Sequence, residues 1–173
     1  LSTTRGIGAA RRWIYDEFKR MSPKLQVAYD RHMLAQQGRI SREVELVNVV
    51  AVLPGKSARR VYITGHYDTV NSRRPAGADA TATAAGAAPS APLVRPTIDN
   101  DADAPGANDD GSGTSLTMEL ARVFAESGIE FDATLVFVTW AGEEQGLIGS
   151  MAHATALRHA KGVVEANFNN DIV

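Results

Sequence analysis

Residues 44–68, with the sequence VELVNVVAVLPGKSARRVYITGHYD, decide the fold. Two runs rich in β-branched and apolar residues, 44–53 and 60–65, are separated by a Pro-Gly pair that favours a turn. Neither run alternates regularly between apolar and polar residues. Dense apolar runs of this kind are typical of strands that are buried on both faces of a sheet, so we expect helices to cover both faces.

The rest of the chain supplies further strands and the helices that alternate with them. Helices are predicted over residues 5–21, 113–127 and 149–160, and further strands over 133–140 and 166–172. Alternating strands and helices indicate the α/β class, with a mixed, largely parallel sheet and helices on both faces. The apolar residues expected to face the core from the middle helix are Leu116, Leu120, Val123 and Phe124.

Two stretches have a different character. Residues 25–41 are predicted to form a loop with some strand. Residues 73–104 are rich in Ala, Pro, Gly and Thr, contain almost no large apolar residue and have no periodicity. A long segment of this kind is typical of a surface excursion. We therefore expect a single domain over residues 1–173 that is interrupted by a surface insertion at 73–104.

Composition and charge exclude several classes of function. The chain has 173 residues, of which 44% are hydrophobic and 22% are charged, as in ordinary globular domains. Its net charge of −2 argues against a nucleic-acid partner. No apolar run reaches the roughly 18 residues of a membrane span, so no membrane partner is expected. Because there is no cysteine, any metal must be held by His, Asp and Glu.

Acidic residues and a histidine follow the predicted strands or precede the middle helix. They are His66 and Asp68, Asp109, Glu143 and Glu144, and Asp171. Ligands of open α/β sheets bind beyond the carboxyl ends of the strands, where these groups would meet. Taken singly, each motif has an ordinary explanation as a surface pair, a helix cap or a solvated face. Taken together, converging carboxylates repel one another unless a cation neutralises them.

One histidine among several carboxylates favours zinc, or another divalent transition ion, over calcium. A pair of ions about 3.5–4 Å apart polarises a carbonyl and lowers the pKa of bound water to about 7 in hydrolytic enzymes. A second glutamate beside a ligand glutamate can then accept the proton of that water. The sequence therefore predicts a hydrolytic metal site.

Four motifs in order resemble peptidase family M28, the co-catalytic zinc aminopeptidases of bacterial secreted type. They are HYD at 66–68, PGANDDGSG at 105–113, GEEQGLIGS at 142–150 and ND at 170–171. The resemblance extends from about residue 44 to the end of the chain. It implies the zinc-exopeptidase fold, which is phosphorylase/hydrolase-like.

The resemblance also implies a site for two zinc ions. His66 and Asp171 would bind one zinc, Asp109 would bridge both ions, and Glu144 would bind the other. The family's catalytic domain continues further and supplies a final histidine, and no residue of this chain is expected to replace it. We therefore expect the chain to be the amino-terminal part of the domain, with a sheet that is incomplete at its C-terminal side.

Further roles follow from the same resemblance. Glu143 would be the general base that activates the bridging water. Asp68 would orient His66 through its other ring nitrogen. A cis peptide bond is expected between Asp109 and Asp110. The remaining histidines are not expected to bind metal: His32, His153 and His159.

The implied function is that of an aminopeptidase, a metal-dependent exopeptidase that removes N-terminal residues from peptides. A carboxypeptidase or dipeptidase of the same superfamily, a one-zinc cyclase-like relative and a non-catalytic interaction domain remain alternatives. The isolated chain is expected to be inactive unless a companion chain supplies the missing part. Family habit points to a secreted or periplasmic protein.

Overall fold

The computed structural model describes residues 2, 4–38, 40, 42–73, 97–98 and 103–171. They fall into two compact units, Leu1–Asp68 with Gly106–Val173 and the smaller Thr69–Pro105. In the smaller unit, β4 (Ser72–Arg73) pairs antiparallel with β5 (Thr97–Ile98). Most of the predicted insertion at 73–104 lies outside the described residues, so the predicted domain organisation stays a prediction.

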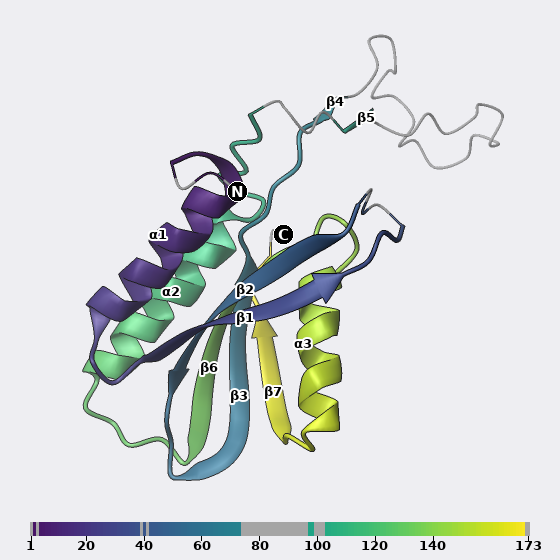
Figure 1. The fold of residues 1–173 in the computed structure, drawn as a ribbon. Coiled ribbons are helices and arrows are strands. Elements are labelled where there is room, and N and C mark those ends of the chain that lie inside the picture. Colours follow the sequence, from purple (N-terminus) through teal and green to yellow (C-terminus); the bar gives the residue numbers. More distant parts are fainter. Residues whose placement is uncertain are drawn as a thin grey trace, which may run out of the picture. The chain divides into compact units, whose positions relative to one another are not determined.

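The larger unit is built on a five-stranded sheet with the order β1-β2-β6-β3-β7 (Figure 1). Its strands are β1 (Gln26–Leu34), β2 (Val44–Leu53), β3 (Ser57–His66), β6 (Ala133–Trp140) and β7 (Val164–Asn169). Strand β6 pairs parallel with β3, and β3 pairs parallel with β7. Strand β2 is antiparallel to both β1 and β6. The mixed α/β class is thus confirmed, with parallel pairing on the β6-β3-β7 side of the sheet.

Strand β1 is a full strand where the sequence predicted mainly loop. It pairs with β2 from Gln26 opposite Val52 to Leu34 opposite Val44. Polar residues in its middle hid the apolar signal, because its side chains are half-buried or exposed rather than part of a dense core. One of them, Arg31, forms an ion pair with Glu45 across the two strands, with an N–O distance of 2.8 Å.

Helices cover both faces of the sheet, as predicted. Helices α1 (Gly6–Met21) and α2 (Gly111–Glu126) lie on one face, and α3 (Ile148–His159) lies on the other (Figure 1). Neighbouring residues of β2 show the division, since Val49 belongs to the core under α1 and α2 and Val50 to the core on the α3 side. No helix in the described ranges is both long and apolar enough to cross a membrane.

The buried face of α2 differs from the predicted one. Leu116 and Val123 are exposed, at 47% and 41% of their surface. Leu120 and Phe124 pack only partly against the core. The side of α2 that faces the sheet is instead made largely of small residues, which let the helix approach the strands closely. The buried residues are Gly113, Thr114, Thr117, Met118, Ala121 and Ala125.

Helix α3 is attached to the sheet by a polar network around Asp30 of β1. One carboxylate oxygen, Asp30 Oδ2, accepts three side-chain hydrogen bonds of 2.9 Å each. The donors are His32 Nε2, Asn48 Nδ2 and His153 Nδ1. Burial disfavours the carboxylate, but the hydrogen bonds from His153, Asn48 and His32 outweigh it and hold the pKa of Asp30 well below its ordinary value.

We predict that Asp30→Asn lowers the free energy of unfolding at pH 7 by about 1–3 kcal/mol, because it removes a charged acceptor from partly buried donors. A lowered folded-state pKa gives stability that is present above the unfolded pKa of about 3.9 and is lost as pH falls from there toward the folded pKa. Urea unfolding should therefore show a smaller difference between wild type and variant at pH 3 than at pH 7.

The exposed Asp132 offers a matched control, since Asp132→Asn should change stability little at either pH. An Asp30→Asn destabilisation of the same size at pH 3 and pH 7 would contradict the role given to the ionised carboxylate.

Candidate metal centre

The first turn of α2 holds the end of β3 in place. His66, the last residue of β3, donates its backbone N–H to Asp110 Oδ2 at 2.8 Å. Its carbonyl accepts a hydrogen bond from Thr114 Oγ1, also at 2.8 Å. The Asp110 side chain is fully buried and also caps the helix by accepting from Gly113 N at 3.0 Å. Both polar groups of the His66 backbone are therefore satisfied by side chains of α2.

The same turn of α2 lies against the chain that leaves β7. A Cβ atom on Gly113 would lie 2.1 Å from the carbonyl oxygen of Asn170, so only glycine permits this approach. Asn170 donates its backbone N–H to Thr64 O at 2.7 Å and its side-chain Nδ2 to Thr117 Oγ1 at 3.3 Å. These contacts position Asp171, the next residue along the chain.

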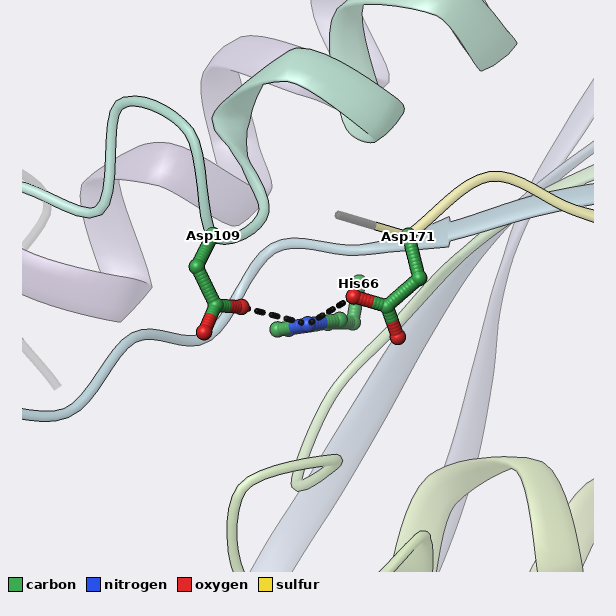
Figure 2. Close-up of side chains that lie close together, drawn as sticks. All are labelled: His66, Asp109 and Asp171. Carbon is green, nitrogen blue, oxygen red and sulfur yellow. Dashed lines mark ion pairs between the residues drawn. The ribbon is translucent and has the colours of Figure 1, made fainter. Parts of the chain in front are cut away.

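Three candidate ligands meet around the His66 ring (Figure 2). Asp109 Oδ1 lies 3.2 Å from His66 Nε2, and Asp171 Oδ1 lies 3.8 Å from it. One ligand atom from each of the three residues lies within 4.8 Å of the other two. The peptide bond between Asp109 and Asp110 is cis, as the family resemblance implied.

The ring nitrogen that faces these carboxylates lacks an ordinary partner. His66 Nδ1 lies 3.0 Å from the carbonyl oxygen of Asp68, which can only accept a hydrogen bond, so Nδ1 carries a hydrogen. Nε2 is buried and makes no hydrogen bond. In the neutral ring its lone pair would face carboxylate oxygens, a repulsive arrangement that a proton or a metal ion on Nε2 relieves. These residues fit a divalent metal ion.

The charges around His66 favour the protonated form of its own imidazole ring. Burial opposes the charged imidazolium, but the hydrogen bond to Asp68 and the carboxylates of Asp68, Asp110 and Glu143 outweigh it and raise the pKa of His66. The site is therefore built to stabilise positive charge at this ring.

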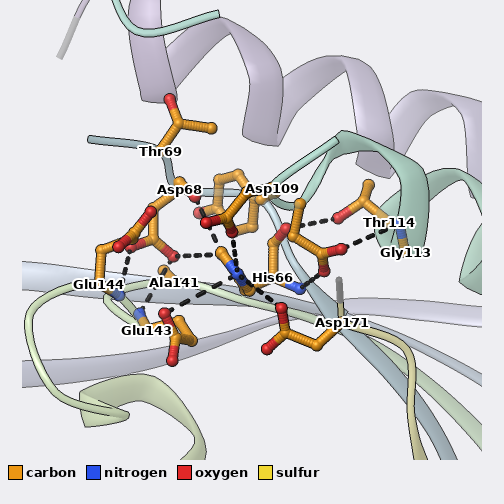
Figure 3. A network of polar contacts seen from close by, with 12 residues as sticks. His66, Asp68, Thr69, Asp109, Gly113, Thr114, Ala141, Glu143, Glu144 and Asp171 are labelled. Carbon is orange, nitrogen blue, oxygen red and sulfur yellow. Dashed lines mark hydrogen bonds and ion pairs between the residues drawn. The ribbon is translucent and has the colours of Figure 1, made fainter. Parts of the chain in front are cut away.

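Asp68 contacts the other ring nitrogen of His66, the contact through which it was expected to orient the ring. The acceptor is the main-chain carbonyl of Asp68 and not its carboxylate, whose Oδ1 is 3.8 Å from His66 Nδ1. The carboxylate instead accepts the backbone N–H groups of Glu143 at 3.1 Å and of Glu144 at 3.2 Å (Figure 3). Asp68 thus connects His66 to the turn that carries both glutamates.

The two glutamates lie in an acidic environment. Glu143 Oε2 is 3.8 Å from His66 Nε2. Burial raises the pKa of Glu143, and the carboxylates of Asp171, Asp68 and Asp109 add to this rise against the opposing effect of His66. Burial and the carboxylates of Asp109 and Glu143 likewise raise the pKa of Glu144. The charge of Asp109 therefore acts on Glu144. Glu144 is nevertheless not a member of the group formed by His66, Asp109 and Asp171.

Buried polar residues that sequence patterns did not assign to the site hold it together. Asp110, Thr114 and Thr117 are each less than 10% exposed and contact the ends of β3 or β7. The helix-cap pattern of the sequence could have indicated that Asp110 caps α2. Its hydrogen bond with the His66 backbone could not be predicted in this way, because that contact depends on the packing of α2 against β3. Two of the three predicted non-ligands, His32 and His153, lie in the Asp30 network instead.

The fold and the site define an α/β protein with a candidate metal centre at the carboxyl ends of its parallel strands. The family model described as "Peptidase family M28" matches residues 48–173, and the chain belongs to this family.

A sequence relative agrees with this membership, and two solved structures share the fold. A probable zinc metalloprotease of Pyricularia oryzae is 41% identical over 176 residues, which covers 98% of this chain and 30% of the relative. The Legionella pneumophila LapA aminopeptidase has a similar fold, with a TM-score of 0.63 and 24% identity over 99% of this chain and 38% of that chain. A Porphyromonas gingivalis glutaminyl cyclase has a TM-score of 0.65 and 18% identity over 95% of this chain and 52% of that chain.

The chain spans only part of its relatives' length. It covers 30% of the Pyricularia oryzae protein and 36% of a probable zinc metalloprotease of Leptosphaeria maculans. The activity of the whole protein is therefore a matter for proposal.

We predict that the chain binds Zn²⁺ and that His66→Ala abolishes tight binding, because the variant removes the only nitrogen ligand of the group. Isothermal titration calorimetry of the chain with ZnCl₂ measures the loss. His159→Ala, which changes an exposed histidine of α3, is the matched control and should bind as wild type does. Equal affinity of the His66→Ala variant and wild type would show that zinc binds elsewhere.

Proposed function

We propose that the protein is a zinc-dependent exopeptidase, and specifically an aminopeptidase that hydrolyses N-terminal residues from peptides. The observation that carries the proposal is the buried, unbonded Nε2 of His66, with carboxylate oxygens of Asp109, Asp171 and Glu143 at 3.2–3.8 Å. Membership of peptidase family M28 supports hydrolysis of a peptide bond as the reaction.

Four residues of this chain are the proposed zinc ligands. His66, Asp109 and Asp171 would hold one zinc ion, and Asp109 with Glu144 would contribute to a second. Zinc bound there would supply Lewis acidity, polarising the scissile carbonyl and lowering the pKa of water.

Glu143 is the proposed general base. Its carboxylate would take a proton from water as the water oxygen bonds to the carbonyl carbon. As the C–N bond breaks, Glu143 would deliver that proton to the leaving nitrogen. The bond between the Glu143 amide and Asp68 would keep the carboxylate near the reacting atoms.

The lining of the cavity beside His66 favours an amino-terminal substrate. The described residues that line it include Glu143, Ser150 and Asp171 but no Lys or Arg. A carboxypeptidase needs such a cationic side chain to bind the terminal carboxylate of its substrate. We propose aminopeptidase specificity on this basis.

Segments beyond this chain contribute to the proposed activity. Because the chain covers about a third of its relatives' length, we propose that turnover needs further parts of the domain, in the same polypeptide or in a companion chain. We also propose that the protein acts outside the cytoplasm, on peptide substrates.

A form of the protein that spans the length of its relatives should release p-nitroaniline from aminoacyl p-nitroanilides. A chelator should abolish this release and added Zn²⁺ should restore it, because the proposed chemistry requires the metal. Zinc-dependent cyclisation of glutamine-initiated peptides without hydrolysis would favour a cyclase instead. Zinc binding with neither reaction would favour an interaction domain.

In the same form, Glu143→Gln should lower kcat by about 100-fold or more, because it removes the group that accepts the proton. Zinc affinity at the His66 cluster should be unchanged, since this residue is outside the group of three ligands. Glu130→Gln, at a side chain that is 84% exposed, is the control and should leave kcat unchanged. A fully active Glu143→Gln variant would exclude Glu143 as the base.

A further inference from the structure

The segment from Ala141 to Gly149, here called the glutamate loop, runs from the end of β6 into the first two residues of α3 and carries Glu143 and Glu144. Main-chain bonds close its base, since Gly149 N donates to Ala141 O at 3.1 Å and Ile148 N donates to Gly142 O at 2.9 Å. Its tip is held by Asp68, through the amides of the two glutamates. The position of the two glutamates therefore depends on Asp68 at the tip of the loop and on the groups that hold its two ends.

Asn48, in the middle of β2, is that anchor. Its side chain is completely buried, between the buried apolar residues Val47 and Val49 of the strand. Asn48 Oδ1 accepts the backbone N–H of Ala141 at 3.0 Å, and Nδ2 donates to the carbonyl of Gly149 at 3.1 Å. A single carboxamide thus contacts the first and last residues of the glutamate loop. Only a side chain with both a donor and an acceptor can satisfy both ends.

Two further features fix this contact. Asn48 Nδ2 also donates to Asp30 Oδ2 at 2.9 Å, which sets the orientation of the carboxamide because a carboxylate only accepts. A Cβ atom on Gly149 would lie 2.4 Å from Asn48 Oδ1 and 2.2 Å from Ala141 O. Glycine at position 149 therefore permits the close approach of the loop to β2.

We propose that Asn48 is a positioning residue for catalysis: by holding both ends of the glutamate loop, it sets where Glu143 and Glu144 stand relative to His66. The inference rests on the proposed function, since it assumes that Glu143 transfers the proton. The ligands His66, Asp109 and Asp171 come from other segments, whereas the side-chain hydrogen bonds of Asn48 go to Asp30, Ala141 and Gly149. Loss of Asn48 should therefore displace the general base Glu143 without changing the binding of the first zinc ion.

Hydrogen exchange of the chain tests the anchor without any activity. In Asn48→Ala, the amides of Ala141, Glu143 and Glu144 should exchange about ten-fold faster than in wild type, because buried hydrogen bonds at the loop base are lost. Zinc affinity at the His66 cluster should be unchanged. Exchange equal to wild type would overturn the proposal, and so would loss of zinc binding, which would make Asn48 a general structural residue.

Thr139→Val is the matched control. Thr139 is completely buried on the neighbouring strand β6, opposite Val49, and its hydroxyl makes no hydrogen bond. The variant should leave exchange in the glutamate loop unchanged. The same acceleration in this variant would overturn the specific role of Asn48.

Asn48→Thr keeps a polar side chain that suits a strand and serves if Asn48→Ala does not fold. Its hydroxyl is attached one atom closer to the backbone than the carboxamide oxygen and nitrogen, so it cannot reach both Ala141 and Gly149. At least one end of the loop is then released, and the amide of Ala141 or the amides of Ile148 and Gly149 should exchange faster. Wild-type exchange at all three amides would contradict the anchor.

Kinetics link the anchor to catalysis in the form that spans the relatives' length. Asn48→Ala should lower kcat by about 10- to 100-fold, the usual effect of losing a group that orients a catalytic residue, with little change in KM. Unchanged kcat in the variant would overturn the positioning role. If the wild-type form itself lacks hydrolytic activity, the proposed function fails. Hydrogen exchange still tests whether Asn48 holds the glutamate loop, because that measurement does not depend on activity.

Discussion

The candidate site depends above all on the buried carboxylate of Asp110. It accepts one hydrogen bond from the end of β3, at His66, and one from the start of α2, at Gly113. Asp109 precedes it, so the contact that caps the helix also brings the histidine and the carboxylate ligand together. Because unpaired buried groups are costly, neither N–H can leave this carboxylate without loss of stability.

A second constraint is the excess of negative charge around one buried ring. The Asp68 carbonyl fixes the hydrogen on His66 Nδ1, which leaves Nε2 facing Asp109, Glu143 and Asp171. Carboxylates that converge on one ring repel one another, and a cation among them relieves this repulsion. Against the opposing effect of burial, the hydrogen bond to Asp68 and the carboxylates of Asp68, Asp110 and Glu143 raise the pKa of His66. A divalent metal ion fits the same excess of negative charge.

Much of the fold and of the ligand set could be predicted, because each depends on local patterns. The strands over 44–53 and 133–140 were predicted with their observed bounds, and His66, Asp109 and Asp171 do meet. Strand β1 was predicted only in part, as some strand within a loop, because its pairing with β2 outweighs its polar sequence. The anchors were missed because their partners are distant in sequence, as Asn48 and Gly149 are, 101 residues apart. The carboxylate contact of Asp68 likewise appears only once β3 and the glutamate loop are adjacent.

The central claim is that His66, Asp109 and Asp171 bind one zinc ion together. X-ray absorption at the zinc edge, on the chain loaded with one equivalent of Zn²⁺, tests it most directly. The account predicts one histidine nitrogen at about 2.0–2.1 Å with carboxylate oxygens completing the shell, and loss of the imidazole scattering in His66→Ala. A shell of oxygen alone in the wild-type chain would contradict it.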